Sequence, residues 1–180
     1  QNGCYVSLTI LPELVLNALP ARDSVTGLMD VEAFGRVARQ QRHASRQGET
    51  DLQLFHLQGL PQQLDRLPAV RAKAVMSEIG GLLRSMATGS GLATQLDADK
   101  FGVVARQSDA RQLLGLLQNR VEAVLKDEGI RDPAVTTVAE TVNLDLKGLD
   151  AAGTARALAH ALKTFAESGC LGSDNLKDCL

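Results

Sequence analysis

Apolar residues recur along most of this chain at the three- and four-residue spacing of an amphipathic helix. The pattern predicts one helix after Asp30, which is a good N-cap, and it marks Gly48 as the exit. Helical structure is predicted again between Pro61 and Met86, where Pro68 is expected to divide a short helix from a longer one. Two further helices are expected, over residues 108–129 and 150–169.

Short apolar or alternating runs between the helices predict β-strands. The first covers residues 51–57, a second pair flanks the polar turn at residues 97–100, and the last, rich in valine and threonine, covers residues 134–142. After the first helix the expected element order is therefore β-α-α-β-β-α-β-α. Strands separated by helices, with one hairpin, are typical of an α/β or α+β sheet that is covered by helices.

The composition is that of an ordinary globular domain, with 180 residues of which 44% are hydrophobic and 22% are charged. This length is enough for one sizeable core. Aromatic residues make up only 3% and tryptophan is absent, so we expect a mainly aliphatic core. The formal net charge of −2 gives no overall attraction to nucleic acid or to an anionic membrane, and we expect neither as a partner.

The cysteines, at positions 4, 170 and 179, are odd in number and form no C-x-x-C pair. This pattern indicates neither a zinc site nor a disulfide framework, and it favours a reducing compartment, the cytoplasm. The segment Tyr5–Leu19 is apolar, but Pro12 and Glu13 interrupt it and it is too short to span a bilayer. Any membrane anchor of the protein is therefore expected to lie outside this chain.

Three motifs, in order along the chain, resemble those of the GGDEF (diguanylate cyclase) family. Residues 23–28, Asp-Ser-Val-Thr-Gly-Leu, match D-x-L-T-G-L; residues 97–101, Asp-Ala-Asp-Lys-Phe, take the place of Gly-Gly-Asp/Glu-Glu-Phe at a hairpin tip; and residues 161–169 follow the helix motif A-L-Y-x-A-K-x-x-G. The resemblance covers residues 23–169 and implies a central, mostly antiparallel sheet of about five strands with helices on both faces. Residues 1–22 are then an N-terminal connecting segment or helix, and residues 170–180 a C-terminal tail or linker.

The family joins two GTP molecules into cyclic di-GMP, and two acidic positions hold the Mg²⁺ that this phosphoryl transfer needs. The resemblance places His56 at the first of these positions and Asp99 at the second, so one acid is retained. Lys100 stands where active members carry a catalytic acid. Asp97 and Ala98 stand where two glycines let the backbone approach the nucleotide.

For the individual side chains, simpler structural roles are expected. His56 is predicted to be a partly buried structural histidine rather than a ligand of another metal. Asp97 and Asp99 are predicted to form the turn rather than to bind a cation. Lys100 is predicted to be a solvated turn lysine rather than an anion-binding group.

The sequence therefore predicts a GGDEF-like domain without diguanylate cyclase activity, catalytic residues, bound metal or cofactor, in which His56 and Asp99 mark a vestigial metal site. Its role would be regulation, dimerisation or protein interaction in cyclic di-GMP signalling, with an adjoining domain such as an EAL domain, a protein partner or a second copy as its partner. Three alternatives stay open: a receptor for GTP or cyclic di-GMP, a weakly active cyclase, and an unrelated α/β binding domain. Against the first, residues 61–68 contain no counterpart of the family's guanine-binding residues, and its product-inhibition motif is replaced at Thr88 and Gly91.

Overall fold

The chain folds with the element order that the sequence predicts. The computed structural model describes residues 21–44, 50–88, 91–106, 109–143 and 151–171. Its helices are α1 (Val31–Ala44), α2 (Leu60–Leu64), α3 (Ala69–Met86), α4 (Ala110–Asp127) and α5 (Ala151–Ser168). Its strands are β1 (Thr50–Gln58), β2 (Ala93–Asp97), β3 (Lys100–Arg106) and β4 (Thr136–Asn143). Pro68 separates α2 from α3, as expected.

Local capping explains where several helices begin and end. Asp30 is the N-cap of α1, as predicted, because its Oδ1 accepts the N–H of Glu32 at 2.8 Å and that of Ala33 at 3.1 Å. Beyond α4 and α5, Gly129 and Gly169 have φ angles of +91° and +73°, which glycine adopts without strain. The other predicted helix ends lie outside the described residues: Gly48, Ser108 and Asp150.

Within the described residues the sheet has four antiparallel strands in the order β2-β3-β1-β4, one fewer than the family resemblance implies. At the outer edge of β2, an isolated bridge pairs Met29 in parallel with Thr94. The Met29 N–H donates to the Ala93 carbonyl oxygen at 2.9 Å, and the Thr94 hydroxyl donates to the Met29 carbonyl oxygen at 2.8 Å.

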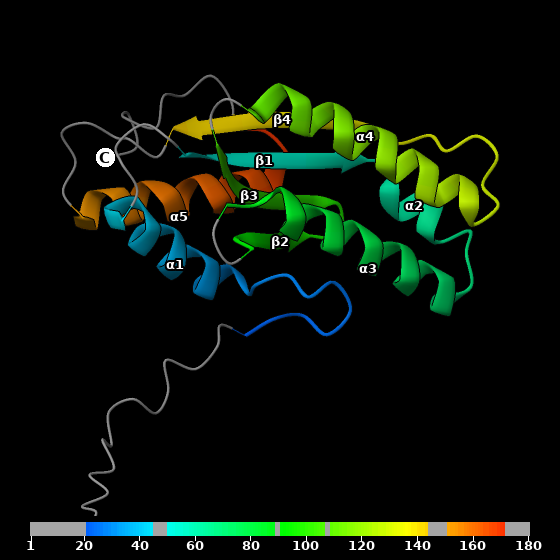
Figure 1. The fold of residues 1–180 in the computed structure, drawn as a ribbon, viewed down its shortest axis with the longest axis horizontal. Coiled ribbons are helices and arrows are strands. Elements are labelled where there is room, and N and C mark those ends of the chain that lie inside the picture. Colours follow the sequence, from blue (N-terminus) through cyan, green and yellow to red (C-terminus); the bar gives the residue numbers. More distant parts are fainter. Residues whose placement is uncertain (1–20, 45–49, 89–90, 107–108, 144–150, 172–180) are drawn as a thin grey trace, which may run out of the picture.

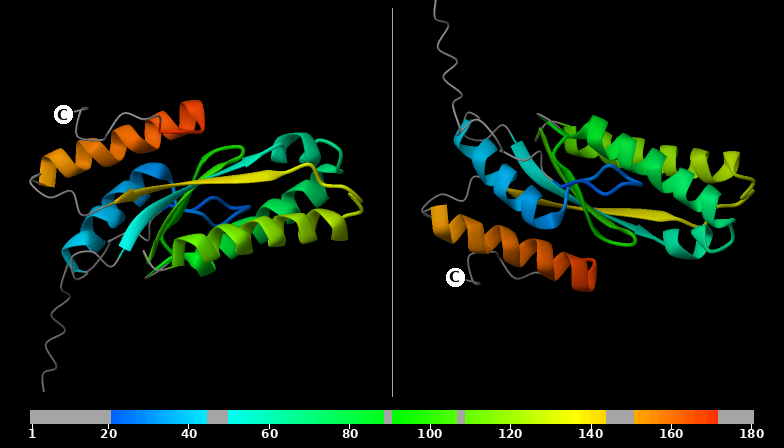
Figure 2. Two further views of the ribbon diagram at one scale, coloured as in Figure 1. Left: turned by 90° about the horizontal axis from the view of Figure 1, so that it is seen from above. Right: turned by 90° about the horizontal axis from the view of Figure 1, so that it is seen from below.

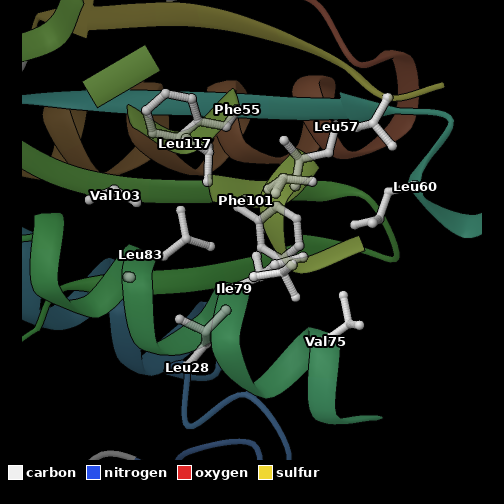
Figure 3. Close-up of a cluster of buried hydrophobic side chains, with 14 of the residues drawn as sticks. Leu28, Phe55, Leu57, Leu60, Val75, Ile79, Leu83, Phe101, Val103 and Leu117 are labelled. Carbon is white, nitrogen blue, oxygen red and sulfur yellow. The ribbon is translucent and has the colours of Figure 1, made fainter. Parts of the chain in front are cut away.

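Helices cover both faces of the sheet, as predicted: α3 and α4 lie on one face, and α1 and α5 lie on the other (Figures 1 and 2). Each face has its own cluster of buried side chains. The core is not purely aliphatic, because every phenylalanine of the chain is fully buried, at positions 34, 55, 101 and 165. Figure 3 shows Phe55 and Phe101 among the leucines, isoleucine and valines between the sheet and α3.

The turn formed by residues 23–28 is a packed structural element rather than a loose loop. One carboxylate oxygen of Asp23 accepts the N–H groups of Val25 and Thr26, at 3.0 and 2.7 Å, and the Thr26 hydroxyl at 2.9 Å. These bonds, that from the Thr26 N–H first, hold the pKa of Asp23 below its ordinary value. Helix α3 approaches the turn at Gly80, where any side chain would meet the Thr26 backbone. The turn at residues 23–28 is therefore packed directly against α3.

Candidate functional site

The side chains singled out by the sequence gather where the end of β1 meets the turn between β2 and β3. In the sheet register His56 of β1 pairs with Lys100 of β3, while Asp97 ends β2 and Asp99 lies in the turn. Because His56 is two residues beyond Leu54, its side chain lies on the same face of the sheet, the one that α5 covers. The end of α5 is therefore the third element of the site.

His56 and Asp99 form a hydrogen-bonded pair. Nε2 of His56 lies 3.1 Å from Oδ2 of Asp99, and each side chain is 17% exposed. The Leu57 N–H donates to the backbone carbonyl oxygen of Asp99 at 2.8 Å, which fixes the turn against the end of β1. His56 is thus partly buried, as predicted. The carboxylate of Asp99 is already paired with an imidazole.

Lys100 is only 9% exposed, so the expectation of a solvated turn lysine is wrong. Its Nζ donates to Oδ2 of Asp97 at 3.0 Å and to the backbone carbonyl oxygen of Ala166 at 2.8 Å. Ala166 lies in the last turn of α5, where carbonyl groups without a helical partner and the helix dipole favour a cation. The lysine points inward because it binds the turn carboxylate and the helix end at the same time.

The remaining turn residues shape the hairpin. The Ala98 N–H donates to Oδ1 of Asp97 at 2.8 Å, so Asp97 acts as a turn former, as predicted. Phe101, the residue after Lys100, is fully buried against the opposite face and packs in the cluster under α3 and α4. Lys100 and Phe101 therefore point to opposite faces of the sheet: Lys100 points to the face that α5 covers, and Phe101 to the face that α3 and α4 cover.

Three contacts hold the end of α5, and the residues that follow it, against the sheet. We call them the α5 anchor: Lys100 with Ala166, His56 with Gly169, and Glu140 with Leu171. Gly169 packs so closely on the imidazole that a β-carbon on it would lie 2.5 Å from Nδ1 of His56. The Leu171 N–H donates to Oε2 of Glu140, on β4, at 2.8 Å. Sequence reasoning did not single out Glu140, because a contact between β4 and the end of α5 leaves no local pattern.

Asp97 gives this site a defined dependence on pH. The Ala98 N–H, and after it the Lys100 ammonium, hold the pKa of Asp97 below its ordinary value of about 3.9. A lowered folded-state pKa stabilises the fold above the unfolded-state value, and this contribution disappears as the pH falls through the folded-state value. We expect Asp97→Asn to be less stable than wild type by a constant amount above about pH 5, with the difference vanishing well below pH 3.9. Urea unfolding across this range measures it; a difference that grows towards acid pH would contradict the assignment.

Removing the Lys100 ammonium while keeping its apolar stem is expected to loosen the end of α5. Lys100→Met should lower the free energy of unfolding by about 1.5 kcal/mol, the low end for a hydrogen bond to a charged group. Lys163→Met is the matched control, because Lys163 lies on α5 itself and its side chain is 77% exposed. Urea unfolding gives both values, and equal effects in the two variants would show that the contacts of Lys100 contribute nothing.

As a metal site this arrangement is poor. His56 and Asp99 offer one nitrogen and one carboxylate, and the neighbouring carboxylate of Asp97 is paired with the Lys100 ammonium. Across the part of the chain that the structure describes, no group of three or more histidine, cysteine, aspartate or glutamate side chains is placed to hold a metal ion. Within the same ranges every helix is too short or too polar to span a bilayer.

Comparison with known proteins identifies the fold through structure rather than sequence. No protein-family model matches the chain, and no curated protein matches it. Among solved structures, a diguanylate cyclase/phosphodiesterase from Caldicellulosiruptor saccharolyticus superposes with a TM-score of 0.54 at 15% identity, over 81% of this chain and 86% of that one.

Two further solved structures give similar values. A microbial GGDEF domain studied with cyclic di-GMP has a TM-score of 0.52 at 18% identity, over 82% of this chain and 91% of that one. The GGDEF domain of FimX from Pseudomonas aeruginosa has a TM-score of 0.50 at 17% identity, over 84% and 96%. At such identities the likeness shows the fold and not the activity. The chain has the fold of a GGDEF domain.

Proposed function

We propose that this chain is a GGDEF-like signalling domain that does not make cyclic di-GMP. It acts as a regulatory, dimerisation or protein-interaction module of a cyclic di-GMP pathway, and it controls an adjoining domain such as an EAL domain. The observation that carries the proposal is the pairing of Asp99 with His56 at 3.1 Å, at the two positions where the family resemblance expects two metal-binding acids.

The chemistry of these side chains does not fit Mg²⁺. This ion prefers oxygen ligands in octahedral geometry, and at a phosphoryl-transfer site it is held by carboxylates together with the substrate phosphates. His56 presents a ring nitrogen, and the carboxylate of Asp99 is engaged with it. The adjoining carboxylate of Asp97 is paired with the Lys100 ammonium, so it offers no free negative charge to a divalent cation.

The same contacts argue against tight binding of a triphosphate. Lys100 is the cation of the turn, and its ammonium already donates to Asp97 and to Ala166. Because Asp97 is paired with Lys100, the hairpin tip has no uncompensated positive charge to attract a phosphate. Polar groups that satisfy one another in this way gain little by exchanging partners for a ligand.

A second candidate is a receptor that binds GTP or cyclic di-GMP without turnover. It is favoured by the structural likeness to a GGDEF domain whose interaction with cyclic di-GMP has been described. Isothermal titration calorimetry of the whole chain with GTP plus Mg²⁺, and separately with cyclic di-GMP, distinguishes the candidates. Our proposal predicts no binding heat at micromolar ligand; micromolar binding without product would replace it with the receptor function.

Restoring the missing acid is expected to create a weak magnesium site. His56→Asp places a second carboxylate opposite Asp99, whereas His56→Asn is a control of the same shape without the charge. If the new site has a dissociation constant of about 1 mM, 10 mM Mg²⁺ stabilises this variant by about 1.4 kcal/mol, or roughly 3–6 °C in melting temperature. We expect no such shift for wild type or His56→Asn. A shift of similar size in wild type would show that His56 and Asp99 already hold the ion.

A further inference from the structure

An apolar groove of about 310 Å³ lies between α1 and α5, on the face of the sheet opposite to α3 and α4. Val31 and Gly35 of α1 form one wall, Ala155 and Ala159 of α5 form the other, and Leu96 of β2 closes one side. Val31 is one of the few large hydrophobic side chains that the described part of the chain leaves exposed, at 38%. The groove thus presents apolar surface to solvent.

The N-terminal segment of the same chain, residues 5–19, has the composition to fill this groove. Ten of its fifteen residues are hydrophobic, and Glu13 is its one charged side chain. It joins the described part of the chain at Ala21, which lies close to one residue of the groove wall. The carbonyl oxygen of Ala21 accepts the N–H of Asp30 at 2.9 Å, and Val31, the next residue, lines the groove.

The lengths are compatible as well. The stretch of α5 that lines the groove, from Ala155 to Ala166, is about 16 Å long at 1.5 Å per residue. The fifteen residues 5–19 measure about 22 Å as a helix and up to about 50 Å when extended, so the segment is long enough to cover this stretch. The short connection to Ala21 gives an effective concentration in the millimolar range, so that modest contacts are enough for docking.

We propose that residues 5–19 dock into the groove between α1 and α5 of their own chain. This inference does not depend on the proposed function. It places the N-terminal segment beside the turn, because Leu96 precedes Asp97 and Ala166 accepts the hydrogen bond of Lys100. A segment in this position transmits a displacement of the N-terminus to the α5 anchor.

Hydrogen–deuterium exchange of the whole chain, with fragments covering residues 5–19, tests the proposal. We expect amide exchange there to be at least about tenfold slower than in the unfolded chain, and to become fast in Ala159→Glu, which puts a charge in the groove. Ala152→Glu is the matched control, because Ala152 is exposed on the same helix but lies outside the groove. Both positions are exposed, so neither change is expected to unfold the domain.

Gly35→Leu provides an independent variant. A β-carbon on Gly35 meets no atom within 4 Å, so the new side chain has room to occupy the groove and displace the segment. Fast exchange of residues 5–19 in wild type, or slow exchange that survives both Ala159→Glu and Gly35→Leu, would overturn the proposal. Protection that appears only at concentrations where the protein dimerises would overturn it as well, and would assign the groove to the segment of a second copy.

Discussion

Replacing Gly80 with alanine is expected to lower the free energy of unfolding by about 3 kcal/mol, the upper end for overpacking a core. A β-carbon at this position would lie 2.8 Å from the Cα of Thr26 and closer still to the Thr26 carbonyl oxygen. Both obstacles are backbone atoms of Thr26. They cannot rotate away, because Thr26 is held in its turn by the carboxylate of Asp23.

The neighbouring residue gives a matched control. A β-carbon on Gly81 has as its nearest neighbour a guanidinium nitrogen of Arg84, at an ordinary 3.8 Å. Gly81→Ala should therefore stabilise α3 by about 0.5–1 kcal/mol through helix propensity alone. Urea unfolding of the two variants measures both effects. If Gly80→Ala were also stabilising, the turn at residues 23–28 would not be packed against α3 as described.

Gly169→Ala is expected to destabilise the domain by about 2 kcal/mol. One part of the effect is the φ angle of +73°, which disfavours any residue with a side chain by about 1 kcal/mol. The other part is the contact with His56, whose Nδ1 would lie 2.5 Å from the new β-carbon. The imidazole is held in place by its hydrogen bond to Asp99.

The two parts can be separated. Gly129→Ala carries the same backbone strain, at φ +91°, but a β-carbon there meets no atom within 4 Å, so we expect about 1 kcal/mol. In a double-mutant cycle, His56→Ala should recover about 1 kcal/mol of the loss caused by Gly169→Ala. A cycle without coupling would mean that the end of α5 does not rest on His56.

Much of the fold follows from local sequence signals. The apolar spacing predicts the helices, Pro68 divides the second helical stretch, and Asp30 caps α1 through its own side chain. The hairpin was predictable for the same reason, since a polar turn between two apolar runs needs only neighbouring residues. Asp97 confirms this, because its turn-forming bond goes to the next residue in the chain.

What the sequence could not provide are contacts between distant segments. By helix propensity Gly80 and Gly81 are equivalent, and only the position of Thr26, more than fifty residues earlier, separates them. Lys100 has the sequence context of a solvated turn residue, yet the carbonyl of Ala166 draws it inward. The α5 anchor is invisible in the sequence for the same reason.

Because the polar side chains of the turn pair with one another and with the end of α5, we expect this GGDEF-like domain not to process nucleotide. Prolonged incubation of the whole chain with GTP and Mg²⁺, followed by chromatographic analysis of the nucleotides, tests it most directly. Asp99→Asn, which removes the one retained acid, controls for contaminating enzymes. We expect GTP to be recovered unchanged in both samples. Cyclic di-GMP formed by the wild-type chain and lost in Asp99→Asn would contradict it.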